Sequence, residues 1–383
     1  MARVVDPSFM RELERYGASD VKSCFNCGNC TAVCSLTEAG AIFPRKFIRY
    51  AQLGMKDRLA ASKEMWLCYY CGDCSATCPR QAEPGEFVAA ARRYIIAHYD
   101  PTTIARHLYT SNIFAGVFLF ITAAILTVIM LTGFGSMPRN TLQLGSFINV
   151  EYIHYTGQAV IIIAGFIGLL SLVNMVKRLN QALTSQETTM EEAAEAESQR
   201  PNVWQRLSKA AYEVVSQTRF DKCESDQAPW YMKRRFIHLS IMWGFLGLLA
   251  ATTLDLLFKT PFSHVPLYYP MRFLGTIAGL FVMYGTTAAL YNRMAQKDKY
   301  SAHSLMSDWL FLGLLWLVTF TGFIVELSVY VSAGSVAAYG VFLLHIVLAM
   351  MLVLLLPFTK FAHAVLRPVA LFIHELKGMA SHA

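Results

Sequence analysis

Charged residues are scarce in this chain, because Asp, Glu, Lys and Arg make up only 15% of its 383 residues. A soluble globular protein has about 25% charged and about 45–50% apolar residues, whereas this chain is 55% hydrophobic. We therefore expect much of it to lie in lipid. The net charge of +7 comes without a basic stripe interleaved with aromatic residues. Basic loops that orient a membrane protein explain this charge, so nucleic acid is excluded as a partner.

The chain also lacks two other signals. Its first ten residues contain no apolar signal segment, so we expect the N-terminal domain to stay in the cytoplasm, where disulfides are disfavoured. No Gly-x-Gly-x-x-Gly fingerprint follows a predicted strand. The chain itself is therefore not expected to bind a flavin or a nicotinamide.

Apolar runs beyond about residue 105 are long enough to cross a bilayer, which takes about 20 residues. They predict six spans, with a kink near Pro357 in the last. The predicted spans are residues 112–134, 152–176, 235–258, 271–292, 308–331 and 336–362.

Loop charges predict the orientation of these spans. The loops after the second and fourth spans are rich in Lys and Arg, whereas the opposite loops hold only Arg139, Lys259 and Arg272. Basic loops stay inside, so both termini and the N-terminal domain are placed in the cytoplasm, and the chain in the cytoplasmic membrane. Four segments follow: a cytoplasmic domain over 1–105, the first two spans over 106–178, a linker with an amphipathic helix over 179–233, and the last four spans over 234–383.

Eight of the nine cysteines form two copies of one pattern, Cys-x2-Cys-x2-Cys-x3-Cys, and Pro follows the second copy. This pattern is typical of two-cluster bacterial ferredoxins, in which the fourth cysteine of each run ligates the other cluster. Two zinc sites are the alternative, but they usually show paired Cys-x2-Cys halves. Gly28 and Gly72 hold matching positions, where they let the backbone approach the sulfurs. The predicted ligands are Cys24, Cys27, Cys30 and Cys78 for one [4Fe–4S] cluster, and Cys68, Cys71, Cys74 and Cys34 for the second.

Four histidines fall within the predicted spans or at the end of one, where an ionisable side chain indicates function. By depth, His238 pairs with His363 near the cytoplasmic side, and His154 pairs with His345 near the outer side. His345 and His363 lie 18 residues apart, five turns of one continuous helix, so they would face the same way. Each pair would hold one six-coordinate b-type haem. The alternative for each histidine is an interhelical hydrogen bond or a position in the interface.

Together these features predict a mainly α fold: an α-helical two-cluster ferredoxin-type domain joined to a six-helix transmembrane haem-binding bundle.

At these residues the chain resembles known families. The cysteine region resembles the C subunit of heterodisulfide reductase. Residues 341–369, VFLLHIVLAMMLVLLLPFTKFAHAVLRPV, and residues 235–247, RFIHLSIMWGFLG, resemble haem helices of the gamma subunit of respiratory nitrate reductase, and Asp308-Trp-Leu-Phe-Leu with Thr321-Gly322 fits the helix between them. That family carries a second histidine where this chain has Leu248, and His154 is the substitute ligand that depth suggests. The fusion of both halves resembles the C subunit of the quinone-interacting membrane-bound oxidoreductase of sulfate reducers.

The resemblance implies electron transfer from menaquinol, through the haems and the clusters, to FAD- and Fe–S-containing partner subunits and onward to adenylylsulfate reductase. Alternatives are a membrane subunit of a heterodisulfide reductase-like complex and a redox-sensing membrane anchor. Glu326 and Asp255, near the outer ends of their spans, are candidates to take protons from the quinol. A site on the cytoplasmic side, near Asp308 and His303, is the rival.

Overall fold

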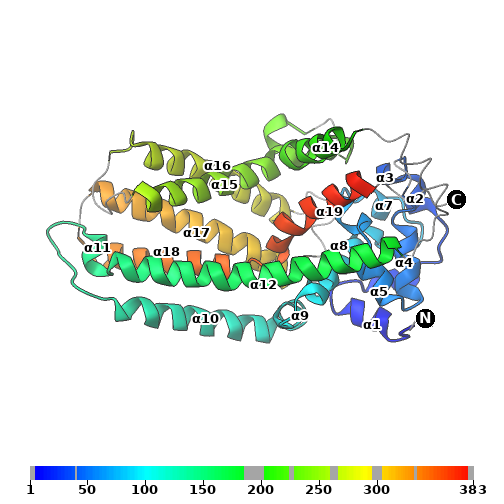
Figure 1. The fold of residues 1–383 in the computed structure, drawn as a ribbon, viewed down its shortest axis with the longest axis horizontal. Coiled ribbons are helices and arrows are strands. Elements are labelled where there is room, and N and C mark those ends of the chain that lie inside the picture. Colours follow the sequence, from blue (N-terminus) through cyan, green and yellow to red (C-terminus); the bar gives the residue numbers. More distant parts are fainter. Residues whose placement is uncertain are drawn as a thin grey trace.

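The computed structural model describes residues 5–38, 41–184, 202–223, 228–258, 266–295, 304–331 and 334–377. Over these residues the chain is helical and forms no β-strand, apart from one isolated bridge between Phe134 and Ile148. The molecule is elongated: long helices form one end, and short helices form the other (Figure 1). The predicted mainly α fold class is confirmed.

Short helices make up the N-terminal part, because tight turns at the cysteines interrupt the chain every few residues. The longest of them, α8, begins at Pro84, whose fixed backbone angle suits a first helical position. These helices are α1 (Phe9–Glu14), α2 (Asn29–Ala32), α3 (Ser35–Glu38), α4 (Arg45–Gln52), α5 (Lys56–Ala60), α6 (Glu64–Leu67), α7 (Asp73–Ala76), α8 (Pro84–Tyr99) and α9 (Ile104–Thr110).

In the described part of the chain, six helices are long and apolar enough to cross a membrane, as predicted. Helices α15 and α16 pack against each other, α16 packs on α17 and α17 on α18, and α10 and α12 cover the other side of α18 (Figure 1). The first described helix, α1, and the last, α19, lie at the same end of this bundle (Figure 1). The six helices are α10 (Asn112–Thr132), α12 (Val150–Thr184), α15 (Arg234–Phe258), α16 (Pro270–Met294), α17 (Met306–Val331) and α18 (Val336–Leu354).

The last predicted span is wrong in one respect, because α18 ends at Leu354 instead of bending at Pro357 and continuing to residue 362. Proline has no backbone N–H and its ring clashes with the preceding turn, so the helix stops before it. Turns and a short 3-10 helix, η5 (Lys360–Ala362), follow, and a separate helix, α19 (His363–Lys377), then begins. His345 and His363 therefore lie on two different helices.

Helix α12 is longer than the predicted span, which ended at residue 176. Its 35 residues extend about 50 Å, well beyond a hydrocarbon layer of about 30 Å. The last turns of the helix, from Asn174 onward, reach the cysteine-bearing domain. There Met175 and Leu179 are buried, and Asn174 Nδ2 donates to the Tyr99 carbonyl at 3.0 Å. The helix thus ties the far end of the membrane bundle to that domain.

The predicted amphipathic helix of the linker is present as α14 (Val203–Ser216). It packs against α19, but it turns Arg206 and Glu213 inward and leaves Trp204 and Tyr212 exposed. Arg206 Nη1 donates to the Leu376 carbonyl at 2.8 Å, so polar contacts hold this helix in place. The 3-10 helices η2 (Thr218–Cys223) and η3 (Trp230–Met232) lead from α14 to α15.

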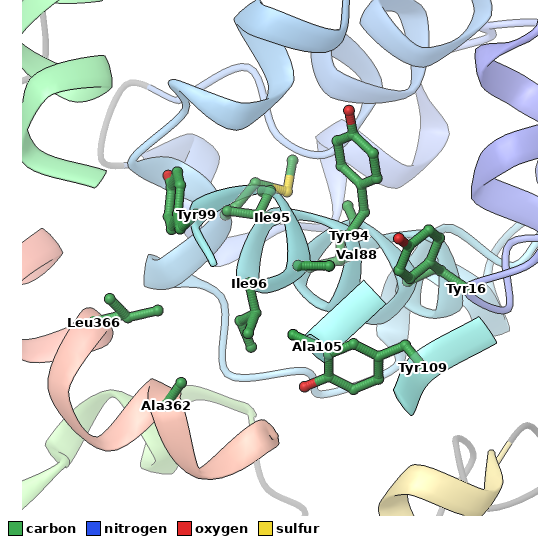
Figure 2. Packing of buried hydrophobic residues seen from close by; sticks show 14 of the residues in the cluster. Tyr16, Val88, Tyr94, Ile95, Ile96, Tyr99, Ala105, Tyr109, Ala362 and Leu366 are labelled. Atoms are coloured by element: carbon green, nitrogen blue, oxygen red, sulfur yellow. The ribbon is translucent and has the colours of Figure 1, made fainter. Parts of the chain in front are cut away.

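One hydrophobic core runs from the cysteine-bearing domain into the membrane bundle. Figure 2 shows Ile96 of α8 directed toward Ala362 and Leu366, while Tyr109 of α9 lies beside Ala105. All five of these residues are buried in the same cluster of side chains. The two halves therefore meet over a packed apolar contact, which fixes their relative position.

Candidate metal centres

The two cysteine runs fold into loops with the same backbone. Asn26 and Tyr70, at equivalent positions, have φ of 62° and 60°, and Gly28 and Gly72 have φ of 94° and 87°. Each glycine is the residue before a one-turn helix, α2 or α7. Only glycine adopts this left-handed backbone without strain, so the glycines allow both loops to wrap closely.

The first predicted ligand set comes together at the junction of the two loops. Burial raises the pKa of the Cys24 thiol, and the neighbouring Cys78 and Cys27 raise it further. Burial also raises the pKa of Cys30, which has Cys24, Cys27 and Cys78 as charged neighbours. Cys78 thus lies with the run that begins 54 positions earlier, and not only with its own run.

In the second predicted set, too, the fourth cysteine of one run lies with the first three cysteines of the other. Burial raises the pKa of Cys34 to about 11, and its charged neighbours are Cys68 and Cys71. Burial raises the pKa of Cys74 as well, with Cys68, Cys71 and Cys34 as neighbours, followed by Cys30. The structure therefore places Cys34 with the second run. That these eight thiolates ligate two clusters stays a prediction.

Hydrogen bonds hold the two loops to one another and to the sulfurs. Asn29 Nδ2 donates to the Thr77 carbonyl at 2.5 Å, across the two runs. The amide of Tyr70 donates to Cys68 Sγ at 3.2 Å, and the amide of Ala82 donates to Cys78 Sγ at 3.4 Å. Hydrogen bonds from backbone amides to sulfur stabilise the thiolate charge and tune the reduction potential of a cluster, so these contacts suit cluster ligands.

A single-ion centre has a tighter geometry. Within the described ranges, no three His, Cys, Asp or Glu side chains converge closely enough to hold one metal ion. In a cubane cluster each thiolate binds a separate iron, so its four thiolates stay farther apart than the ligands of one zinc ion. Six of the eight thiols are half-buried, Cys30 is buried and Cys27 is exposed, and together with the amide donors they fit such a cluster.

The inner histidine pair is brought together although its members lie on α15 and at the start of α19. The ring centroids of His238 and His363 are 6.0 Å apart. A metal–nitrogen bond of about 2 Å on each side and a ring radius of about 1 Å would put two imidazoles on one metal about 6 Å apart. His363 Nδ1 bonds to the Lys360 carbonyl, a contact that typically orients a ligating imidazole. His238 Nδ1 is buried and has no partner in the described structure. These two side chains fit a bis-histidine haem.

A row of rings joins the second cysteine loop to this pair. Tyr69, next to Cys68, packs its ring 4.4 Å from that of Phe220. The Phe220 ring lies 5.6 Å from the His238 ring, measured between centroids. Phe220 belongs to η2, so the linker supplies the middle of this contact. These ring contacts thus connect the Cys68 loop to the histidine pair.

Three arginines surround the same loop. Arg367 lies with its guanidinium carbon 3.7 Å from the centre of the Tyr69 ring. Arg92 donates to the backbone carbonyls of Met65 and Cys68, and Arg234 Nη2 donates to the Tyr69 carbonyl at 3.3 Å. Positive charge at this point favours an anionic cluster and holds the loop against the membrane bundle.

The outer histidine pair is placed differently. His345 Nδ1 lies 3.1 Å from the Val318 carbonyl and 3.1 Å from Thr321 Oγ1, both on α17. A Cβ on Gly322 would come within 3.1 Å of the His345 ring, so the ring packs closely on that helix. None of the polar contacts of His345 in the described structure reaches His154, which lies on α12. His345 thus makes an interhelical hydrogen bond through Nδ1, which leaves its Nε2 available, so its ligation of a haem stays a prediction.

The candidate proton acceptors are half-buried near the other end of the bundle. Thr276 Oγ1 lies 2.6 Å from Glu326 Oε1 and 2.9 Å from the Arg272 carbonyl. The Thr276 hydroxyl donates to Glu326 and so holds this carboxylate against α16. Asp255 is half-buried on α15. Of the rival site, Asp308 is described and His303 lies outside the described residues.

Asp308 is the centre of a buried ion cluster that the sequence did not reveal. Its carboxylate lies 2.9 Å from Arg93, 2.5 Å from Lys360 and 3.7 Å from Arg293. The side chains of Asp308 and Arg93 are 3% and 2% exposed. Arg93 Nη1 also donates to the Tyr16 carbonyl at 2.8 Å. The cluster joins α8 of the cysteine-bearing domain to α16, α17 and the segment before His363.

Residues 109–383, more than half of the chain, match the model of a family described as Citrate utilization protein B. The chain belongs to this family. Residues 20–82, which include all eight patterned cysteines, match the model of the 4Fe-4S dicluster domain. This member of the Citrate utilization protein B family therefore carries an iron–sulfur domain ahead of its membrane bundle.

The N-terminal part is also similar to C subunits of heterodisulfide reductases. It is 26% identical over 88 residues to the C subunit of the H(2):CoB-CoM heterodisulfide,ferredoxin reductase of Methanothermobacter thermautotrophicus, covering 23% of this chain and 48% of the relative. It is 32% identical over 94 residues to a protein of Archaeoglobus profundus described as like the C subunit of heterodisulfide reductase, covering 24% of this chain and 50% of the relative. The chain thus spans about half the length of these relatives. No solved structure matches it.

Proposed function

We propose that the chain is the membrane subunit of a redox complex and moves electrons between a quinol in the bilayer and soluble partner subunits. The observation that carries this proposal is the row of rings Tyr69, Phe220, His238 and His363, which links the Cys68 loop to the histidine pair. Bound there, two [4Fe–4S] clusters and a b-type haem would supply one-electron carriers. The protein contributes their ligands, their spacing and a buried, rigid contact between them.

The inner haem site rests on His238 and His363. Their ring centroids lie 6.0 Å apart with the ring planes at 61°, and the Lys360 carbonyl fixes the tautomer of His363. For the outer site, His154 and His345 are the proposed ligands. The Val318 carbonyl holds His345 through Nδ1, as the Lys360 carbonyl holds His363, and leaves Nε2 available to a metal.

The quinol site is proposed near Glu326 and Asp255. Oxidation of one quinol releases two electrons and two protons, so carboxylates must accept the protons. The Thr276 hydroxyl donates to Glu326 Oε1 and holds this carboxylate in place. We propose menaquinol as the quinone species, and a bundle orientation with the cysteine-bearing domain in the cytoplasm, as the basic loops indicate.

The partners are proposed to be FAD- and Fe–S-containing subunits, with adenylylsulfate reductase as the onward acceptor. Similarity to the C subunits of heterodisulfide reductases favours a second candidate, a membrane subunit of a heterodisulfide reductase-like complex. The electron path inside the chain is the same in both. A redox-sensing anchor is the third reading, and two cysteine runs argue against it, since a sensor needs only one cluster.

The proposal is tested by His238→Ala and His363→Ala, measured by a pyridine haemochrome assay on the purified full-length protein. Each variant should lose the same haem, and His374→Ala, which changes a buried histidine of the same helix α19, serves as the control. In the wild type, a menaquinol analogue should reduce the haem rapidly. A haem content that is unchanged in both variants, or no reduction by quinol, would overturn the proposal.

A further inference from the structure

The short turn η5, which leads into α19, is packed against two membrane helices. The ring of Phe361, in the middle of this turn, lies 4.9 Å from that of Phe245 on α15 and 5.1 Å from that of Phe311 on α17, measured between centroids. The Thr359 hydroxyl caps the turn by accepting from the Phe361 amide at 3.4 Å. These contacts fix where the turn lies in the bundle.

Lys360, the first residue of this turn, makes contacts in two directions. Its backbone carbonyl is bonded to His363 Nδ1. Its side chain reaches Asp308 of α17, where Nζ lies 2.5 Å from Oδ1. A neutral imidazole that donates from Nδ1 presents Nε2 as its acceptor, the nitrogen that would bind a metal. The carbonyl that orients His363 and the ammonium that binds Asp308 therefore belong to one residue.

The carboxylate of Asp308 is itself held firmly. Its Oδ2 accepts from Arg93 Nη2 at 2.9 Å and from the Leu305 amide at 3.3 Å. The side chains of Asp308 and Arg93 are 3% and 2% exposed. Arg93 belongs to α8 of the cysteine-bearing domain, and it also donates to the Tyr16 carbonyl. Charge-assisted hydrogen bonds between buried groups are strong, so Asp308 gives Lys360 a fixed anchor.

We propose that Lys360 is a positioning residue for the His363 imidazole and that Asp308 acts through it. This role rests on the proposed function, in which His238 and His363 hold a haem. A ligating imidazole is oriented by the bond of its other nitrogen, and changes in such supporting groups typically cost about 10–100-fold in metal affinity. The planes of the two rings lie at 61°. When Lys360 is released from Asp308, its carbonyl and the His363 ring should turn together, and that angle should change.

The test compares Lys360→Met with Lys360→Arg in the full-length, haem-loaded protein. Met removes the ammonium but keeps a long side chain and the backbone carbonyl, whereas Arg keeps a cation for Asp308. Low-temperature EPR reports the geometry, because the largest g value of a low-spin ferric haem depends on the angle between its imidazole planes. Lys360→Met should shift this g value and weaken haem affinity about tenfold. Lys360→Arg should keep the wild-type values, and Asp308→Asn should shift the g value in the same direction as Lys360→Met.

Lys56→Met is the matched control. Lys56 Nζ lies 2.5 Å from Glu12 Oε2 and 2.6 Å from Asp6 Oδ2, within the cysteine-bearing domain. Its side chain is 28% exposed, against 31% for Lys360. This variant should lower the free energy of unfolding without moving the g value. A merely structural role for Lys360 would give the same result as the control.

A second measurement does not depend on haem. Hydrogen–deuterium exchange over residues 355–367 should be faster in Lys360→Met than in wild type and unchanged in Lys56→Met, because only the first variant releases the turn. Equal g values and equal exchange in Lys360→Met and wild type would overturn the proposal, as would the same g shift in Lys360→Arg or Lys56→Met. Loss of haem from His238→Ala beside an unchanged Lys360→Met would overturn this role alone, whereas a wild-type protein that binds no haem would refute the proposed function with it.

Discussion

Removal of the Asp308 carboxylate should be among the most damaging single changes in this protein. The carboxylate lies 2.5 Å and 2.9 Å from two cations and 3.7 Å from a third, and its side chain is only 3% exposed. Breaking a buried ion pair on one side typically costs about 3–5 kcal/mol, because the other charge is left uncompensated. With three cations left behind, we expect Asp308→Leu to cost about 5 kcal/mol and the isosteric Asp308→Asn about 3 kcal/mol.

The assay is denaturant titration of the detergent-solubilised protein, with cluster absorbance and tryptophan fluorescence as separate signals. Adding Arg93→Met to Asp308→Leu should restore part of the loss, because it removes one of the uncompensated charges. Asp57→Asn is the control: its side chain is 82% exposed and pairs with Arg178 at 3.3 Å, so it should cost no more than about 0.5 kcal/mol. The reasoning is refuted if Asp308→Asn costs as little as this control, or if the double variant loses the full sum of the two single changes.

Three further predictions concern separate parts of the molecule. Cys34→Ser should remove the EPR signal of the cluster held by the second cysteine run, whereas Cys27→Ser should remove the other signal; the reverse result would contradict the exchange of ligands. Burial lowers the pKa of His98 to about 4, so the unfolded chain binds a proton more tightly, and acid favours unfolding below the ordinary pKa of 6.5. The free energy of unfolding of His98→Leu should therefore fall less than that of wild type between pH about 7 and about 5. An equal fall in both proteins would disprove this. Glu326→Gln and Asp255→Asn should slow quinol-driven haem reduction at least about tenfold. If both variants keep the wild-type rate, and Asp308→Asn loses more activity than its loss of folded protein explains, the quinol site lies on the other side of the membrane.

Sequence patterns predicted the six long apolar helices of the described residues and the equivalence of the two cysteine loops. Six apolar runs predicted six long helices, because hydrocarbon requires each backbone polar group to bond within its own helix. Gly28 and Gly72 indicated two equivalent loops, since only glycine adopts their backbone without strain. These features depend on local chemistry, which neighbouring residues in the sequence express.

Long-range partners were beyond the sequence. Asp308 lies at the start of a span, where a charge normally faces water. No pattern in the neighbouring sequence indicates that Arg93 is its ion-pair partner. Phe220 lies in a polar linker, and only the fold brings it between Tyr69 and His238. An aromatic residue in a linker is too common to single out, so the missing signal is three-dimensional.

The end of the sixth span illustrates a different limit. An apolar stretch that contains proline can bend and continue, or it can stop, and composition does not distinguish the two outcomes. Here the helix stops at Leu354, and His363 begins a new helix. The depth argument that paired His363 with His238 nevertheless selected two rings that lie 6.0 Å apart.

The break between α18 and α19 also bears on how the protein is assembled. Helix α19 packs against α14 of the linker and α6 of the cysteine-bearing domain, and its Glu375 is held by Arg219 at 3.1 Å. The ribosome makes this helix after all six membrane helices. His238 can therefore meet His363 only when nearly all of the described chain has been made. Insertion of the bundle and completion of the histidine pair are then successive events in biogenesis. A chain truncated after Leu354 would therefore insert into the membrane with His238 but without His363.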